Sequence, residues 1–206
     1  MQAIKDVLGF IVEIEKLKAV ERKTRPVGLE RFENSAEHSW HVCMAALMLK
    51  DYANEPVDIF KVIQMLLIHD LGEIHTGDTI IYASETEELK AEEEKGIRKV
   101  LALLPNKDAI NQWMSLWHEF EAGESAEAKF AKAIDRVPPI LHNLHGGGHS
   151  WKTHNISSEK VFSVNQRIEK GSEKLWGVIK EQLDGAIKTG LLKSEKKLNE
   201  TVDKTV

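Results

Sequence analysis

Residues 57–71 read VDIFKVIQMLLIHDL, a strongly apolar segment that ends in a histidine, an aspartate and a leucine. Its length and its apolar side chains are typical of a helix buried in a core. Pro56 stands where a first-turn proline belongs, because the missing N–H is not needed at that position. Gly72 and Gly77 follow, and they mark the end of the helix and a turn. The sequence therefore predicts a core helix over 57–71.

Upstream of this segment, the apolar spacing is also helical. A first amphipathic helix is expected because apolar residues recur at intervals of three and four: Ile4, Val7, Leu8, Ile11, Ile14 and Leu17. Residues 21–34 interrupt the pattern with Pro26 and Gly28, so we expect a loop. Asn34 and Glu37 have the spacing of a capping box and predict the start of a second helix. The apolar face of that helix would be Val42, Ala45, Ala46 and Leu49.

Downstream, helical segments continue to about residue 192. Ser84 and Glu87 predict the start of a helix to about Leu104, and residues 110–120 form a further one. Another helix is expected from Ser125 to about 144, and a last long one from Ser157 or Ser158 to about 183. Residues 79–83 could be extended but are too isolated to form a sheet. The prediction is an all-α, single-domain bundle of about six to eight helices over 1–192, with a polar, frayed tail over 193–206.

Composition narrows the class of protein. The chain has 206 residues, 42% of them hydrophobic and 30% charged, as in a globular domain of ordinary size. A net charge of -5 argues against a general nucleic-acid binder. No apolar run approaches the length of a membrane span, and the N-terminus lacks the apolar core of a signal peptide. Cys43 is the single cysteine, so we expect a cytoplasmic protein without an internal disulfide.

His69 and Asp70, at the end of the apolar helix, are the first candidates for chemistry. They follow four residues expected in the core, MLLI over 65–68. On burial there, His69 and Asp70 would lose their hydrogen bonds to water with no partner to replace them. A divalent cation would compensate, because imidazole nitrogen and carboxylate oxygen are ordinary ligands of first-row metals. The alternative is a buried, hydrogen-bonded His–Asp pair. These two residues alone leave both interpretations open.

Three further residues favour the cation. Glu73 is four residues after His69 and three after Asp70, so it is expected over the same helix face. His38 lies one turn into the second helix, and Asp135 lies in a helix that is otherwise apolar on the same face. Two imidazoles and two carboxylates from three helices would leave coordination positions open for water. This mixed ligand set suits Mn, Fe, Co, Ni or Zn better than calcium.

The order His38, His69-Asp70, Asp135 resembles the HD-domain metal-dependent phosphohydrolase superfamily. Three longer segments extend the resemblance: SAEHS over 35–39, HDLGEIHTGDT over 69–79, and SAEAKF over 125–130. In this order they are similar to the 5′-deoxynucleotidase and HD-domain-containing protein 2-like subfamily. The resemblance extends over about residues 17–151.

This resemblance implies an HD domain that binds one divalent cation through His38, His69, Asp70 and Asp135. The cation would be Mn, Co, Fe, Ni, Zn or Mg, and its identity stays open. The implied activity is hydrolysis of nucleoside 5′-monophosphates, commonly 2′-deoxy ones, to nucleoside and phosphate by attack of a metal-activated water. The resemblance also implies a homodimer.

The same resemblance places Glu73, Asp78 and Arg22 beside the reacting phosphate. Glu73 would orient or deprotonate the water, and Asp78 would contact the water or protonate the leaving oxygen, with acid and base unassigned between them. Arg22 would bind substrate, since guanidinium suits bidentate phosphate contact, although the residue alone would be interpreted as a solvated loop arginine. Lys23 stands where bacterial deoxynucleotidases carry a tryptophan that packs on the nucleotide. The deoxy preference is therefore open.

Two other functions are compatible with the metal ligands. A phosphohydrolase acting on an alarmone or a cyclic nucleotide would need a larger, more basic pocket, and basic residues near the site are mainly in 22–31. A non-catalytic nucleotide-binding or protein-interaction module would bind without turnover. The presence of both Glu73 and Asp78 argues against it, because a site that only binds has less need for two extra carboxylates.

Several histidines have no role in this scheme. His41 is three residues after His38 and is expected to orient a ligand or lie at the core edge. Four more surround the glycines at 146–148 and raise the hypothesis of a second metal site: His142, His145, His149 and His154. No carboxylate joins them locally, so a loop near the pocket mouth or a dimer interface is the favoured interpretation.

Overall fold

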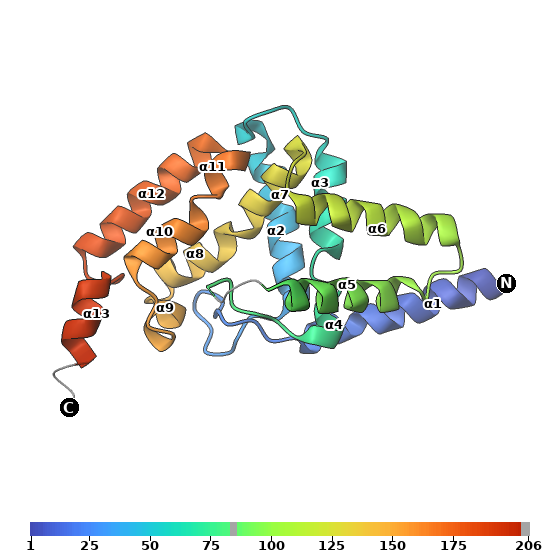
Figure 1. Ribbon diagram of the computed structural model, residues 1–206, viewed down its shortest axis with the longest axis horizontal. Helices are drawn as coiled ribbons and strands as arrows, with labels where there is room; N and C mark the ends of the chain where they lie inside the picture. The colour runs from blue at the N-terminus through green and yellow to red at the C-terminus, as the bar shows by residue number, and fades with distance from the viewer. Residues whose placement is uncertain (83–85, 203–206) are drawn as a thin grey trace.

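The computed structural model describes residues 1–82 and 86–202, and within these ranges the chain is helical with no strand. An isolated bridge between Glu21 and Asn34 is the one β-type pairing in the described chain. The helices form an elongated bundle with the two termini at opposite ends (Figure 1). The all-α prediction is confirmed.

The helices are named in chain order, with two 3-10 helices labelled η. Their bounds are α1 Gln2–Ile14, η1 Glu15–Ala19, α2 Ser35–Leu49, η2 Lys50–Tyr52, α3 Ile59–Ile68, α4 Glu73–Thr76, α5 Glu87–Leu101, α6 Lys107–Ala122, α7 Ala126–Asp135, α8 Val137–His145, α9 His149–Thr153, α10 Ser158–Asn165, α11 Ile168–Gly171, α12 Glu173–Lys188 and α13 Glu195–Val202.

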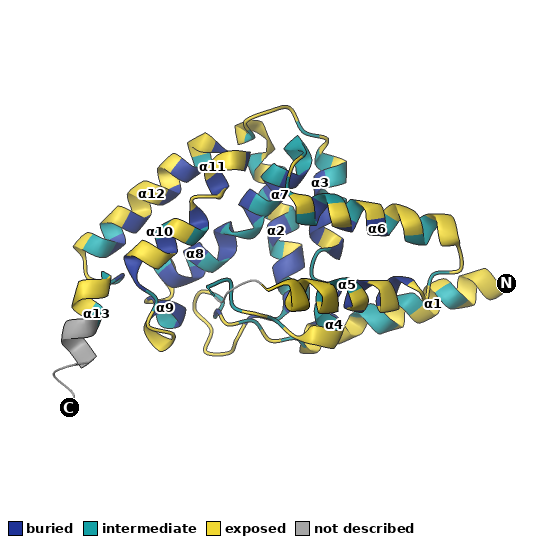
Figure 2. Cartoon of the chain, in the orientation of Figure 1, coloured by how far each residue is buried: buried dark blue, intermediate teal, exposed yellow. Residues whose placement is uncertain are grey.

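Helices α2, α3 and α7 form the centre of the molecule and contact one another (Figure 1). Their facing side chains make the central core cluster, which includes Val42, Met65, Leu66, Phe130 and Ile134. A second core cluster lies among α8 to α12 and a third among η1, α3, α5 and α6, so buried residues lie on both sides of the central helices (Figure 2). Within the described residues, no helix has the length and apolar character needed to cross a membrane.

The predicted capping box at the start of α2 is confirmed. The backbone N–H of Glu37 donates to Asn34 Oδ1 at 3.0 Å, and the N–H of Asn34 donates to Glu37 Oε1 at 2.8 Å. The expected start of α3 is wrong, because Asp58 caps the helix and Pro56 lies two residues before that cap. The helix also ends at Ile68, and after a turn the separate short helix α4 begins at Glu73.

Two predicted long helices are each divided. The segment expected over 125–144 is interrupted at Arg136, and Pro138 and Pro139 lie in the first turn of α8, where their missing N–H groups cost nothing. The last helix is divided into α10, α11 and α12. Ser172 is extended and its hydroxyl accepts from the N–H of Leu175 at 3.1 Å, which caps α12.

The remaining predictions concern surface segments. In α1 no residue is buried; of the predicted apolar face, Ile14 packs against the third cluster and Leu17 in η1 belongs to it, whereas Ile4 and Leu8 are exposed and Phe10 packs there instead. Thr86 caps α5, and the predicted cap Ser84 lies outside the described residues. Residues 79–82 contain no strand, and Ala83 lies outside the description. Where a frayed tail was predicted, residues 195–202 form α13.

Gly171 allows the closest approach between α11 and α7. A Cβ at this position would lie 2.3 Å from the backbone oxygen of Lys129 and 2.7 Å from Ala133 Cβ. We therefore expect Gly171→Ala to lower the free energy of unfolding by about 1–3 kcal/mol, as overpacking does in a closed interface. Urea unfolding followed by circular dichroism would measure it.

The matched control is Gly185→Ala in α12. A Cβ there meets nothing within 4 Å, so alanine should raise the free energy of unfolding by up to about 1 kcal/mol through helix propensity. Equal free energies of unfolding for the Gly171→Ala protein and the parent would show that α11 can move away from α7 without loss of stability.

Candidate functional site

Three side chains far apart in sequence converge at the centre of the bundle. His38 comes from α2, His69 follows α3, and Asp135 is the last residue of α7. Asp135 Oδ1 lies 2.8 Å from His38 Nε2 and 3.3 Å from His69 Nε2. One ligand atom from each residue lies within 4.8 Å of the others, so this trio could hold a metal ion.

His69 is oriented as a ligand. Its Nδ1 lies 2.8 Å from the carbonyl oxygen of Leu66, so Nδ1–H donates there and, in the neutral ring that binds a metal, Nε2 carries the lone pair. Nε2 is buried and has no hydrogen-bond partner, although Asp70 Oδ1 lies 3.1 Å away and Asp135 Oδ1 3.3 Å away. A buried nitrogen lone pair between two carboxylates is destabilising unless positive charge lies among them. The donor set therefore fits a divalent cation.

The electrostatics of the cluster agree with this fit. Burial lowers the pKa of His69, but the carboxylates of Asp70 and Asp135 outweigh it and raise the pKa to about 9. Burial opposes ionisation of Asp135, yet its hydrogen bond with His38 and its contact with His69 hold its pKa well below the usual range. The cluster thus attracts positive charge strongly, and a cation would bind in competition with protons.

Arg22 is not a solvated loop residue. Its side chain is 14% exposed, and Nη1 lies 3.0 Å from Asp70 Oδ2 and 3.5 Å from Asp78 Oδ1. Its Nε lies 3.4 Å from Glu33 Oε2. Although burial alone would lower its pKa, the Asp70 and Asp78 carboxylates raise it, so the guanidinium stays charged inside the site. Arg22 therefore carries a fixed positive charge beside Asp70.

Glu73 begins α4 and faces the same region. Ser35 Oγ donates to Glu73 Oε2 at 2.6 Å, which orients the carboxyl group. Burial, followed by the charge of Asp70, raises the pKa of Glu73 to about 9. Asp78 follows the left-handed turn at Gly77, and burial is the main cause of its raised pKa. Both carboxyl groups thus exchange protons more readily near neutral pH than ordinary surface carboxylates.

A cavity of about 220 Å³ opens onto these groups. Arg22, His69, Asp70, Glu73, Asp78 and Asp135 all line it, whereas His38 is fully buried behind Asp135. The rest of the lining includes basic, aromatic and acidic side chains: Lys23, Lys90, Lys132, Arg136, Tyr82, Trp117, Phe120, Glu93 and Glu121. The cavity thus brings six of the predicted site residues together around space for a small molecule.

Glu33 and Ser35 are functional candidates that sequence reasoning did not single out. Glu33 is 2% exposed, and its Oε2 lies 3.6 Å from His38 Nδ1. In the sequence it is one of several charged residues in a predicted loop, so nothing distinguished it. Ser35 lies beside the capping residue Asn34, and its contact with Glu73 across 38 positions is a tertiary feature.

The other histidines discussed above, and Glu119, lie in different places in the structure. His41 approaches Glu33 and His142 rather than Asp135. The four histidines near 146–148 do not meet: His142 is buried, His145 and His154 are exposed, and His149 contacts Phe32 at 6.0 Å between ring centroids. Within the described residues, no group of three from this set lies at metal-binding distance. Glu119 pairs with Lys61 at 2.7 Å, away from the cavity.

Comparison with known proteins agrees with this geometry. The family model described as HD domain matches residues 14–176. The chain is 30% identical over 140 residues to the Homo sapiens protein named 5′-deoxynucleotidase HDDC2, a match covering 66% of each chain. It spans just under two thirds of that relative's length. The Bos taurus protein of the same name is 31% identical over 140 residues and 66% of each chain.

Two solved structures are similar in fold. A predicted metal-dependent phosphohydrolase from Magnetospirillum magnetotacticum MS-1 has a TM-score of 0.87 and 40% identity, over 94% of this chain and 100% of that one. The PH0347 protein from Pyrococcus horikoshii OT3 has a TM-score of 0.63 and 22% identity, over 86% and 98%, and shows the fold alone. The family model spans most of the chain, and the Magnetospirillum structure matches its fold over 94% of the chain. This protein therefore belongs to the HD domain family.

Proposed function

We propose that this protein is a divalent-metal-dependent phosphohydrolase that removes the 5′-phosphate from nucleoside and deoxynucleoside monophosphates. The observation that carries the proposal is the convergence of His38, His69, Asp70 and Asp135 beside a cavity that Arg22, Glu73 and Asp78 also line. The names of the human and Magnetospirillum relatives support the same reaction class.

The four ligand candidates would hold one cation: His38 and His69 through Nε2, and Asp70 and Asp135 through carboxylate oxygens. When bound, the cation would neutralise charge on the phosphoryl oxygens and lower the pKa of water beside it. Mn, Co, Fe, Ni, Zn and Mg are the candidates, because the donors are nitrogen and oxygen only.

The remaining side chains would handle phosphate and protons. Arg22 offers a buried guanidinium to the phosphate, and a phosphate oxygen there would share its donors with Asp70 and Asp78. Glu73 and Asp78 would divide two tasks: one accepts a proton from the attacking water, and the other donates a proton to the leaving 5′-oxygen. Ser35 keeps Glu73 aimed into the cavity.

Hydrolysis across a substrate panel, followed by chromatography of the nucleotide products, tests the proposal. The chain, loaded in turn with each candidate cation, would be given nucleoside and deoxynucleoside 5′-monophosphates, a cyclic nucleotide and a guanosine tetraphosphate-type alarmone. We expect the monophosphates to be the preferred substrates. Preference for the alarmone or cyclic nucleotide would identify another phosphohydrolase. Thermal stabilisation by nucleotides without turnover of metal-loaded protein would identify a binding module.

We also propose a homodimer in the cytoplasm. Trp40, Met44 and Met48 lie at four-residue spacing on α2 with exposed fractions of 66%, 41% and 67%, an apolar stripe typical of an interface. Light scattering should give twice the mass of one chain, and a monomer mass would exclude the dimer.

The unpaired Cys43, whose pKa burial raises to about 11, supports a reducing compartment.

A further inference from the structure

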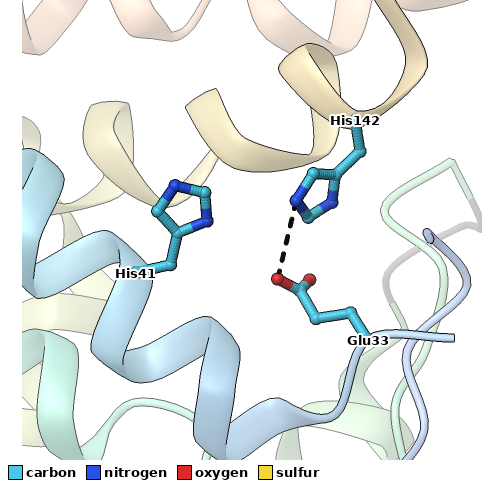
Figure 3. Close-up of side chains that lie close together, drawn as sticks. All are labelled: Glu33, His41 and His142. Atoms are coloured by element: carbon cyan, nitrogen blue, oxygen red, sulfur yellow. Dashed lines mark ion pairs between the residues drawn. The ribbon is translucent and has the colours of Figure 1, made fainter. Parts of the chain in front are cut away.

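A second group of side chains of metal-binding type lies outside the proposed catalytic cluster, the name used here for His38, His69, Asp70 and Asp135. Glu33 precedes α2, His41 is on α2 and His142 is on α8, and all three point into one space (Figure 3). One ligand atom of each lies within 4.8 Å of the others. Glu33 is 2% exposed and His142 5% exposed, whereas His41 is half-buried. We call these three residues the Glu33 cluster.

Hydrogen bonds fix how His142 faces Glu33. Thr24 Oγ1 donates to Glu33 Oε2 at 3.4 Å and so uses its one proton. His142 Nδ1 lies 3.3 Å from Thr24 Oγ1, whose proton is already used, so His142 Nδ1–H must be the donor of that hydrogen bond. In neutral His142, the lone pair is then on Nε2, which faces Glu33 Oε1 at 3.8 Å (Figure 3). Burial lowers the pKa of His142 and so favours this neutral form.

The arrangement leaves two buried electron-rich atoms facing each other. A separation of 3.8 Å is too long for a hydrogen bond. It is close to the separation of two ligands that share one cation at about 2.0–2.2 Å each. Glu33 Oε2 is already occupied by Thr24 and Arg22, so Oε1 is the oxygen left for an ion.

His41 completes a recognisable donor set. Two imidazoles and one carboxylate bind zinc and other first-row divalent cations, with coordination positions left for water. The rings of His41 and His142 lie 5.9 Å apart, on either side of the space above Glu33. Because His41 is half-buried, the cluster has a side from which an ion can enter.

We propose that Glu33, His41 and His142 bind a second divalent transition-metal ion, of the zinc class, distinct from the ion of the catalytic cluster. Glu33 would connect the two sites, since its other oxygen lies 3.4 Å from Arg22 Nε and 3.6 Å from His38 Nδ1. The ion would act as a positioning element that holds Glu33 and the 21–34 loop against α2 and α8. The proposal does not depend on which substrate the protein hydrolyses.

Cobalt binding tests this site without an activity assay. The full chain would be freed of metal and titrated with Co²⁺, with visible absorption and metal analysis as readouts. His142→Gln and, separately, His41→Gln should each bind one equivalent less than the parent. His145→Gln is the matched control, because this residue is on the same helix but exposed, and its metal content should equal the parent's.

The Asp135→Asn background isolates the second site. This variant should still bind one Co²⁺, and adding His41→Gln should remove it. Thermal melts would establish that the variants are folded, and His41→Gln is the safer one because His41 is only half-buried. The proposal is overturned if the folded His41→Gln protein keeps the parent's metal content, or if Asp135→Asn binds no Co²⁺.

Discussion

Asp135→Asn is expected to lower phosphate release from a deoxynucleoside monophosphate by about a thousandfold or more. One oxygen of Asp135 lies within 3.3 Å of both imidazole Nε2 atoms, so a weaker neutral ligand there would disrupt the whole catalytic cluster. A bound cation contributes several kcal/mol to phosphoryl transfer, and each 1.36 kcal/mol corresponds to a factor of about ten in rate. Steady-state rates at saturating cation would measure the loss.

Asp184→Asn in α12 is the matched control for this change. The residue is exposed and remote from the cavity, so its rate should equal the parent's. Chelation of the parent should reproduce the loss, and added Mn²⁺ or Co²⁺ should restore activity to the parent but not to Asp135→Asn. Near-normal activity of folded Asp135→Asn would show that this carboxylate is not a metal ligand.

Glu73→Gln should reduce kcat by about 10²–10⁴-fold while metal content stays unchanged. Glutamine keeps the size of the side chain and can still accept the hydrogen bond from Ser35 Oγ, but it cannot carry a proton between water and substrate. This residue is a carboxyl group with a pKa near 9 that lines the cavity, as expected of a proton-transfer group. Single-turnover rates together with metal analysis would separate chemistry from metal loss.

The control is Glu92→Gln on the exposed face of α5, which should leave kcat unchanged. If Glu73→Gln lowers metal content in parallel with rate, then Glu73 is a ligand rather than a proton carrier. If the rate falls less than about twofold with metal retained, Asp78 would have to perform both proton transfers.

Much of the fold could be predicted because the signals are local. The capping box of Asn34 and Glu37 depends on residues three positions apart, and it was confirmed. The break before α12 could not be predicted, because Ser172 and Glu173 make hydrogen bonds there with Tyr52 and Asn54, about 120 positions away in the sequence. The apolar face predicted for the first helix was wrong at Ile4 and Leu8, which are exposed, and right at Ile14 and Leu17. Apolar spacing identifies a helix, whereas its buried side is set by the partner against which it packs.

The candidate site divides in the same way. The sequence by itself determined the chemical types: two histidines and several carboxylates, in an order similar to one family, at the ends of apolar helices where a cation would compensate their burial. Only the tertiary structure decided which charges meet. It brought Arg22 from a loop into contact with Asp70, and it placed Glu33 between His38 and His142. The physical reason is that desolvation and Coulomb energy depend on distances in space, which the spacing of residues along the chain does not specify.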